Sequence, residues 1–203
     1  MEADLDILGL IGKKIPRNIW ICFWTGMIMG WITHFYMLTH KLPNWDDISQ
    51  INSLGLTKQI GRWMLDYLQF MGQKASNPAI HGMLAILFVS LAACLVVATL
   101  KLESVTASIL IPIIMITFPS LTGVMYFMFT AHLYALCILV FCLSAYMIQR
   151  YKYGFVASGI CIIIGLGLYQ PFISVSISLM LLILIFDALD GTDFRALLKE
   201  GIK

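Results

Sequence analysis

Long apolar segments constrain the fold of this chain more than any other feature. Six of them cover residues 19–38, 78–100, 104–118, 124–148, 154–169 and 172–186. A helix of about 20 apolar residues crosses the hydrocarbon core of a bilayer, where only helices and closed barrels satisfy their own backbone hydrogen bonds. The sequence therefore predicts an all-α polytopic membrane protein, a single transmembrane domain over residues 1–203 with about six transmembrane helices. Three segments are short, and Pro112 and Pro171 mark places where a helix kinks or breaks.

Composition supports the membrane assignment and excludes other classes of protein. Hydrophobic residues make up 60% of the chain and charged residues 12%, with a mean hydropathy of +0.89, which is far from the values of a soluble domain. The five cysteines all lie in apolar segments, without the spacing of a disulfide framework or a zinc site. The net charge is only +2 and the basic residues are scattered, so no nucleic acid is expected as a partner.

Basic residues near the predicted helices indicate how the chain sits in the membrane. They precede the first segment and follow the second, fourth and sixth: Lys13, Lys14, Arg17, Lys101, Arg150, Lys152, Arg195, Lys199 and Lys203. Cytoplasmic loops carry an excess of Lys and Arg, so we predict a cytoplasmic amino terminus (1–18) and a cytoplasmic tail (187–203). The short outer loops predicted at 119–123 and 169–171 carry no charge.

The first apolar segment is predicted to be a permanent anchor. It has a basic flank, but it is too long for the apolar region of a signal peptide and lacks a cleavage site of small residues. Its Gly26 and Gly30 have the GxxxG spacing of closely packed helices. We expect that packing to occur within the chain and not in a dimer.

The long outer segment, residues 39–77, contains a predicted amphipathic helix. One face carries Ile60, Trp63, Met64, Tyr67, Leu68 and Met71, and the other carries Lys58, Gln59, Arg62, Asp66 and Gln69. Such a helix is too polar to cross a bilayer and is expected to lie flat on it, with Trp63 and Tyr67 at headgroup depth. Arg62 has two interpretations: an ion pair with Asp66 four residues later, or a contact to a lipid phosphate.

Two adjacent carboxylates, Asp46 and Asp47, follow the first predicted helix. Asp47 with Gln50 three residues later resembles a capping box, so its role can be to start a short helix. One helix needs only one cap, and Asp46 follows Trp45 at the mouth of the predicted bundle. A carboxylate in this place is a candidate general base for a hydroxyl group.

The turn between the last two predicted helices carries Tyr169 and Gln170. A glutamine here either bonds to backbone carbonyls at the helix ends or lines a sugar pocket together with Tyr169. Aromatic faces and amide donors suit a hexose, which has apolar ring faces and a rim of hydroxyl groups. Trp45 is a candidate on the same grounds, although tryptophan at a membrane interface is ordinary.

Four pieces of the chain together resemble one known family. They are NWDDI at 44–48, GRWML at 61–65, FPSLTGVMYFMFTAHLYALCILV at 118–140 and GLGLYQPFI at 165–173. Their order and spacing, over almost the whole chain, resemble the bacterial serotype-converting O-antigen glucosyltransferases of the GtrII type. Members of that family are usually more than twice as long. We therefore expect the amino-terminal half of such an enzyme, or a truncated relative.

The resemblance implies a GT-C-like glycosyltransferase. Such an enzyme transfers a hexose, here glucose, from a polyprenyl-phosphate carrier to a glycan such as O-antigen on the outer face of the cytoplasmic membrane. The family's acidic residue falls on Asp46, beside Asp47, and its Gly-Arg pair on Gly61 and Arg62. Asp46 and Asp47 are thus the expected catalytic residues, with Asp46 as the base of an inverting displacement. Arg62, for the leaving phosphate, and Trp63 are expected to bind substrate.

One position departs from the family pattern. Where many relatives carry acidic residues at the outer end of the fourth span, this chain has Thr130, Ala131 and His132. His132 is either a polar contact for sugar or phosphate or a packed core residue. Four histidines without paired spacing do not predict a metal site. Because some relatives use a divalent cation, one near Asp46 and Asp47 remains open.

Other function classes remain in view beside sugar transfer. A small transporter or flippase would show ionisable residues deep in the bundle and related repeats, and neither is evident in the sequence. The charges cluster instead at the outer border beside the flat helix, which favours chemistry at a lipid headgroup. A noncatalytic membrane scaffold or an inactive fragment stays open, because half of an enzyme can lack parts of its site.

Overall fold

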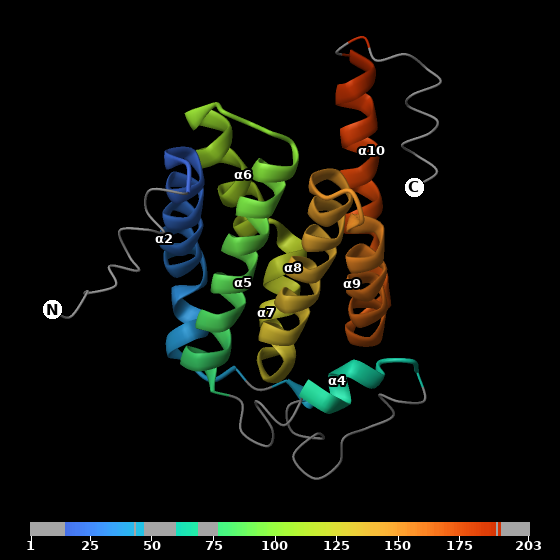
Figure 1. Cartoon of the computed structure of the whole chain (residues 1–203). Coiled ribbons are helices and arrows are strands. Elements are labelled where there is room, and N and C mark those ends of the chain that lie inside the picture. The colour runs from blue at the N-terminus through green and yellow to red at the C-terminus, as the bar shows by residue number, and fades with distance from the viewer. Residues whose placement is uncertain (1–14, 43, 47–59, 69–76, 190, 192–203) are drawn as a thin grey trace, which may run out of the picture.

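The computed structural model of the chain describes residues 15–42, 44–46, 60–68, 77–189 and 191, and these are built from helices (Figure 1). The helices are α2 (Arg17–Thr39), α4 (Trp63–Leu68), α5 (Pro78–Thr99), α6 (Val105–Thr117), α7 (Pro119–Tyr126), α8 (Met128–Arg150), α9 (Gly154–Leu168), the 3₁₀ turn η2 (Gln170–Phe172) and α10 (Ile173–Leu189). No strand occurs within these ranges, so the predicted all-α class is confirmed.

The helices include several that can cross a membrane. Four are long and apolar enough, namely α2, α5, α8 and α10 together with η2, and the pair α6–α7 makes a fifth if it is one bent span. Helix α9 has 15 residues, fewer than the about 20 of a full crossing. The polytopic membrane fold is confirmed, with four or five full-length spans among the described residues where the sequence predicts about six.

The predicted third helix and the loop after it form one bent unit. Residues 119–123, predicted as a loop, begin helix α7, which is bent by 47° from α6. Pro119 has no N–H group and its ring keeps Phe118 extended (φ −62°, ψ 133°), so the helix breaks there. It does not break at Pro112, which lies inside α6. Helix α8 consequently begins at Met128, later than the sequence predicts.

Two buried polar side chains from earlier in the chain hold the bent pair in place. Nε2 of His34 in α2 lies 3.1 Å from the carbonyl oxygen of Ile116, which in an unbroken helix would accept from residue 120. The amide of Asn44 donates to the carbonyl oxygen of Tyr126, the last residue of α7, at 2.8 Å. Because a buried carbonyl needs a donor, these bonds tie both α6 and α7 to the part of the chain that precedes α4.

Two glycines allow α2 to pack closely on α5. A Cβ atom on Gly26 would lie 2.6 Å from Oγ of Ser90, and one on Gly30 would collide with the side chain of Ile86. The predicted packing of the GxxxG segment within the chain is therefore confirmed. Helix α5 in turn packs against α8 through a core that includes Ala85, Val89 and Ala131.

Gly30→Ala is expected to lower the free energy of unfolding by about 1–3 kcal/mol, because the added methyl group must displace Ile86 from a filled core. Gly159→Ala in α9 is the matched control. A Cβ atom there meets nothing within 4 Å, so the substitution should gain up to about 1 kcal/mol in helix propensity. Denaturant titration in detergent measures both values, and equal stabilities of the two variants would contradict the close packing.

Helix α4 lies across one end of the bundle, beside the carboxyl end of α9 (Figure 1). Its Leu65 is 2% exposed and packs in a cluster with Leu133 and Leu168. Trp63 and Tyr67 are exposed, as a position in the headgroup layer would require. The described helix covers six residues. Ile60 and Arg62, predicted on the same helix, lie instead in the turn before it, where Gly61 has φ +82°, and the predicted helix positions 58–59 and 69–71 lie outside the described residues.

Candidate active site

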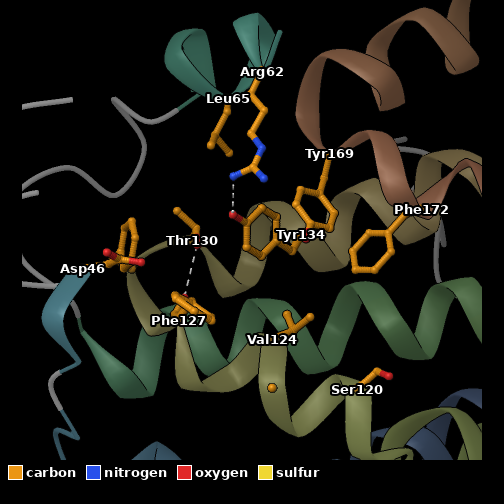
Figure 2. Close-up of a pocket in the computed structure, with 12 residues that line it drawn as sticks. Asp46, Arg62, Leu65, Ser120, Val124, Phe127, Thr130, Tyr134, Tyr169 and Phe172 are labelled. Atoms are coloured by element: carbon orange, nitrogen blue, oxygen red, sulfur yellow. Dashed lines mark hydrogen bonds between the residues drawn. The ribbon is translucent and has the colours of Figure 1, made fainter. Parts of the chain in front are cut away.

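A cavity of about 490 Å³ opens at the end of the bundle where α4 lies (Figure 2). Its lining comes from the segment between α2 and α5, from α7 and α8, and from the turn after α9: Asp46, Arg62, Leu65, Ser120, Gly123, Val124, Phe127, Phe129, Thr130, Tyr134, Tyr169 and Phe172. Sites for small molecules typically measure about 300–1,000 Å³ and combine apolar walls with a few polar groups. This cavity fits that description, with one carboxylate and one guanidinium group in its lining.

Asp46 reaches the cavity because Asn44 fixes the backbone two residues before it. The bond from the Asn44 amide to Tyr126 joins this segment to the carboxyl end of α7, whose Val124 also lines the cavity. The Asp46 side chain is exposed. It lies on the side of the cavity away from Phe172 (Figure 2). A carboxylate at such a rim can accept a proton from a hydroxyl group bound inside.

Arg62 reaches the cavity because the chain turns at Gly61. Gly61 has φ +82°, a left-handed conformation that glycine adopts without strain. The preceding carbonyl oxygen, on Ile60, accepts a hydrogen bond of 3.1 Å from Nε2 of Gln170. From this turn the Arg62 side chain extends toward α8 and the end of α9 (Figure 2).

The guanidinium group of Arg62 contacts two tyrosines. Its Nη1 lies 3.4 Å from the hydroxyl oxygen of Tyr134, and its central carbon lies 4.6 Å from the centre of the Tyr169 ring. Its Nε is buried without a hydrogen-bond partner among the described residues. A guanidinium group has five N–H donors and no acceptor, so it retains donors for an oxygen-rich anion in the cavity.

Three aromatic rings form one wall of the cavity. The ring centres of Tyr134 and Tyr169 are 4.7 Å apart, those of Tyr169 and Phe172 are 4.9 Å apart, and those of Tyr134 and Phe172 are 6.5 Å apart. Tilted and edge-to-face contacts of this kind hold the rings in fixed orientations. The wall offers flat apolar faces and a hydroxyl group next to the only described arginine of the lining, which suits a sugar attached to a phosphate.

Comparison with protein families decides the identity of the chain. The family model described as Glucosyl transferase GtrII matches residues 35–203, a range that contains every residue lining the cavity. The chain belongs to the GtrII glucosyl transferase family. No curated protein and no solved structure shows a significant match. Family membership makes the chain a glycosyltransferase, with a sugar donor and an acceptor as partners, and its apolar helices make it a membrane protein.

Several residues that the sequence nominated for this GtrII site lie outside the cavity lining. Trp45 is 79% exposed beside Asp46. Trp63 packs on α9, where a Cβ atom on Gly167 would lie 2.7 Å from its ring. Gln170 bonds to the carbonyl of Ile60, in the turn before α4, where one of the two sequence interpretations expects a carbonyl at a helix end. Asp47 lies outside the described residues.

His132 lies in the core of the bundle and not in the cavity lining. It is 2% exposed, and its ring stacks on that of His81 from α5 with 4.5 Å between ring centres. Both ring nitrogens of His132 lack a hydrogen-bond partner among the described residues. Within the described ranges no group of three or more His, Cys, Asp or Glu side chains could hold a metal ion. Asp47 lies outside these ranges, so the question of a divalent cation near Asp46 and Asp47 stays open.

Several residues that line the cavity of this GtrII chain were not predicted from the sequence. Phe127, Thr130 and Tyr134 are three and four residues apart at the start of α8, a spacing that puts them on one helix face. That periodicity was available in the sequence. Ser120 and Val124 could not be found by their spacing, because the segment that carries them was predicted in part as a loop.

Proposed function

We propose that this GtrII chain transfers glucose from a polyprenyl-phosphate carrier to a glycan such as O-antigen on the outer face of the cytoplasmic membrane. The observation that carries the proposal is that Asp46 and Arg62 line the same cavity. A carboxylate can activate the acceptor hydroxyl, and a guanidinium group suits the phosphate that leaves. An aromatic wall lies beside them for the sugar ring.

Asp46 is the proposed general base of a single displacement. The acceptor oxygen forms a bond to the anomeric carbon while the bond from that carbon to the phosphate oxygen breaks. The hydroxyl proton passes to the Asp46 carboxylate, and the electron pair of the broken bond stays with the phosphate. One base without a covalent intermediate gives inversion at the anomeric carbon, in contrast to the two carboxylates of a retaining mechanism.

Arg62 is the proposed donor to the departing phosphate. Charge grows on the phosphate oxygens as the bond breaks, and a fixed guanidinium group stabilises that charge more than it stabilises the bound donor. The Tyr169 ring below the guanidinium and the Tyr134 hydroxyl beside it contact the group. Tyr169 and Phe172 then offer ring faces to the hexose.

The distribution of basic residues supports an outer position for the cavity. Four of the six described Lys and Arg residues, Arg17, Lys101, Arg150 and Lys152, lie at the ends of α2, α5 and α8 that point away from α4, and the other two, Lys41 and Arg62, lie at the α4 end (Figure 1). Lys and Arg accumulate on the cytoplasmic side of membrane proteins. The α4 end then faces outward, and both chain termini are cytoplasmic, as proposed from the sequence.

Transfer in oriented membranes tests the proposal. In spheroplasts, labelled glucose supplied on a polyprenyl phosphate is expected to appear on the glycan with inverted anomeric configuration. A cysteine at position 45, from Trp45→Cys, should react with an impermeant maleimide in the same spheroplasts, whereas Lys152→Cys should react only after permeabilisation. Wild type gives the background of the native cysteines, of which four are buried and Cys161 is half-buried.

Two results would contradict the proposal. Transfer from a nucleotide-activated glucose but not from the polyprenyl donor would show that polyprenyl phosphate is not the sugar carrier. Reaction of the cysteine at position 45 only after permeabilisation would place the cavity on the cytoplasmic side.

A further inference from the structure

The end of α9 and the turn after it contact the Arg62 segment at three points. The backbone of Gly167 lies under Trp63, the ring of Tyr169 lies under the guanidinium of Arg62, and the amide of Gln170 reaches the carbonyl of Ile60. These contacts join parts of the chain about 110 residues apart. The end of α9 and the turn after it therefore position the backbone at residues 60–62, and Gln170 binds the first of these residues, Ile60.

The side-chain amide of Gln170 packs closely against the turn at Ile60 and Gly61. Its Nε2 donates to the Ile60 oxygen at 3.1 Å, and a Cβ atom on Gly61 would lie 2.8 Å from the same Nε2. The amide therefore covers a residue that has both a positive φ angle and no side chain. Arg62 follows directly, so the direction in which its side chain leaves the backbone depends on this turn.

Among the described residues, the Arg62 side chain makes one long hydrogen bond, to Tyr134, and one ring contact, with Tyr169, and these two contacts do not fix the guanidinium by themselves. The bond to Tyr134 is long, at 3.4 Å, and Nε has no hydrogen-bond partner among the described residues. A free arginine side chain has many rotamers, and ordering it costs entropy that one long hydrogen bond does not offset. An anchored backbone removes part of that freedom before substrate arrives.

We propose that Gln170 is a positioning residue, which fixes the backbone at Ile60 and Gly61 and so holds the Arg62 guanidinium in the cavity. Gln170 acts through Arg62 and does not touch the sugar. The inference rests on the proposed function, because it requires Arg62 to act on the departing phosphate. It differs from the sugar-binding role that the sequence offers for Gln170.

The first experiment replaces the amide by a side chain of similar length without a donor. Gln170→Met in the full chain is expected to lower kcat for transfer from polyprenyl-phosphate glucose about fivefold to tenfold, the effect of losing one hydrogen bond, with little change in the KM for the acceptor. Ser174→Ala is the matched control, since it removes a side-chain bond to the Pro171 carbonyl in the next turn and should leave kcat unchanged.

The second variant changes the same turn from the other side. Gly61→Ala places a methyl group against the Gln170 amide at a positive φ angle, and kcat should fall at least as far as in Gln170→Met. Gly191→Ala is its control: Gly191 has φ +83° and a Cβ atom there meets nothing within 4 Å. Unchanged kcat in both Gln170→Met and Gly61→Ala would overturn the inference.

Coupling to Arg62 separates positioning from a general structural role. In an Arg62→Lys background, Gln170→Met is expected to change kcat by less than about twofold, because residues that act through one group are not additive. A full additional loss in that background, or a raised KM for the donor with unchanged kcat, would show direct sugar contact or general destabilisation and would overturn the proposal. If Asp46→Asn and Arg62→Lys themselves keep wild-type transfer, the proposed function fails instead.

Discussion

Asp46→Asn is expected to lower kcat for glucosyl transfer about a thousandfold, within the range that general acid–base catalysis contributes. The amide has nearly the shape of the carboxylate but cannot take the proton of the acceptor hydroxyl at neutral pH. Asp46 is exposed at the cavity rim, so the substitution leaves the core untouched. The measurement is the initial rate of transfer from polyprenyl-phosphate glucose in membranes that contain equal amounts of each variant.

Asp187→Asn provides the control with the same chemical change. Asp187 lies near the end of α10 that points away from α4, and its rate should equal that of wild type (Figure 1). Asp47→Asn, measured separately, distinguishes the base from its neighbour in the sequence, and we expect a much smaller loss. Equal rates for wild type, Asp46→Asn and Asp47→Asn would show that Asp46 is not the general base.

Arg62→Lys is expected to lower kcat about a hundredfold, although it keeps the positive charge. Removing a donor that stabilises transition-state charge costs about 10²–10³ in rate, and an ammonium group cannot present the two parallel N–H groups of a guanidinium. It also cannot stack on the Tyr169 ring in the same way. The loss should appear in kcat more than in the KM for the acceptor, because the charge develops during the reaction.

Arg150→Lys is the matched substitution at the opposite end of the bundle. Arg150 is exposed in the last turn of α8, and its replacement by lysine should not alter transfer. Undiminished turnover in Arg62→Lys would mean that charge alone suffices, or that the phosphate binds elsewhere. In either case the role proposed for the guanidinium fork would be wrong.

The fold class followed from the sequence because membrane helices are dictated by local chemistry. The length of an apolar segment, and the need of its backbone to form its own hydrogen bonds in the bilayer, predict a helix without knowledge of the helices around it. The close packing at Gly26 and Gly30 followed from the small size of glycine. Helix α7 could not be predicted in this way. Its start depends on Pro119 breaking the helix and on His34 satisfying the freed carbonyl of Ile116, and that partner lies 82 residues away.

The candidate site was only partly predictable for the same reason. Asp46, Arg62 and Tyr169 were nominated by residue type and by family resemblance, and the structure brings all three to one cavity. Their supports are long-range: Asn44 bonds to Tyr126, and Gln170 bonds to Ile60. A glutamine beside an aromatic residue suits a sugar pocket as well as it suits a backbone anchor, so residue type alone could not choose.

Helix α7 forms part of the cavity wall, yet both hydrogen bonds that secure the bent pair come from side chains that do not line the cavity, His34 and Asn44. The first membrane helix and the few residues after it thus help to set the position of the α7 wall. Attempts to widen the range of accepted glycans can begin at His34, where the wall can be moved without altering any group that meets the substrate, whereas a change at Asn44 would also move Asp46.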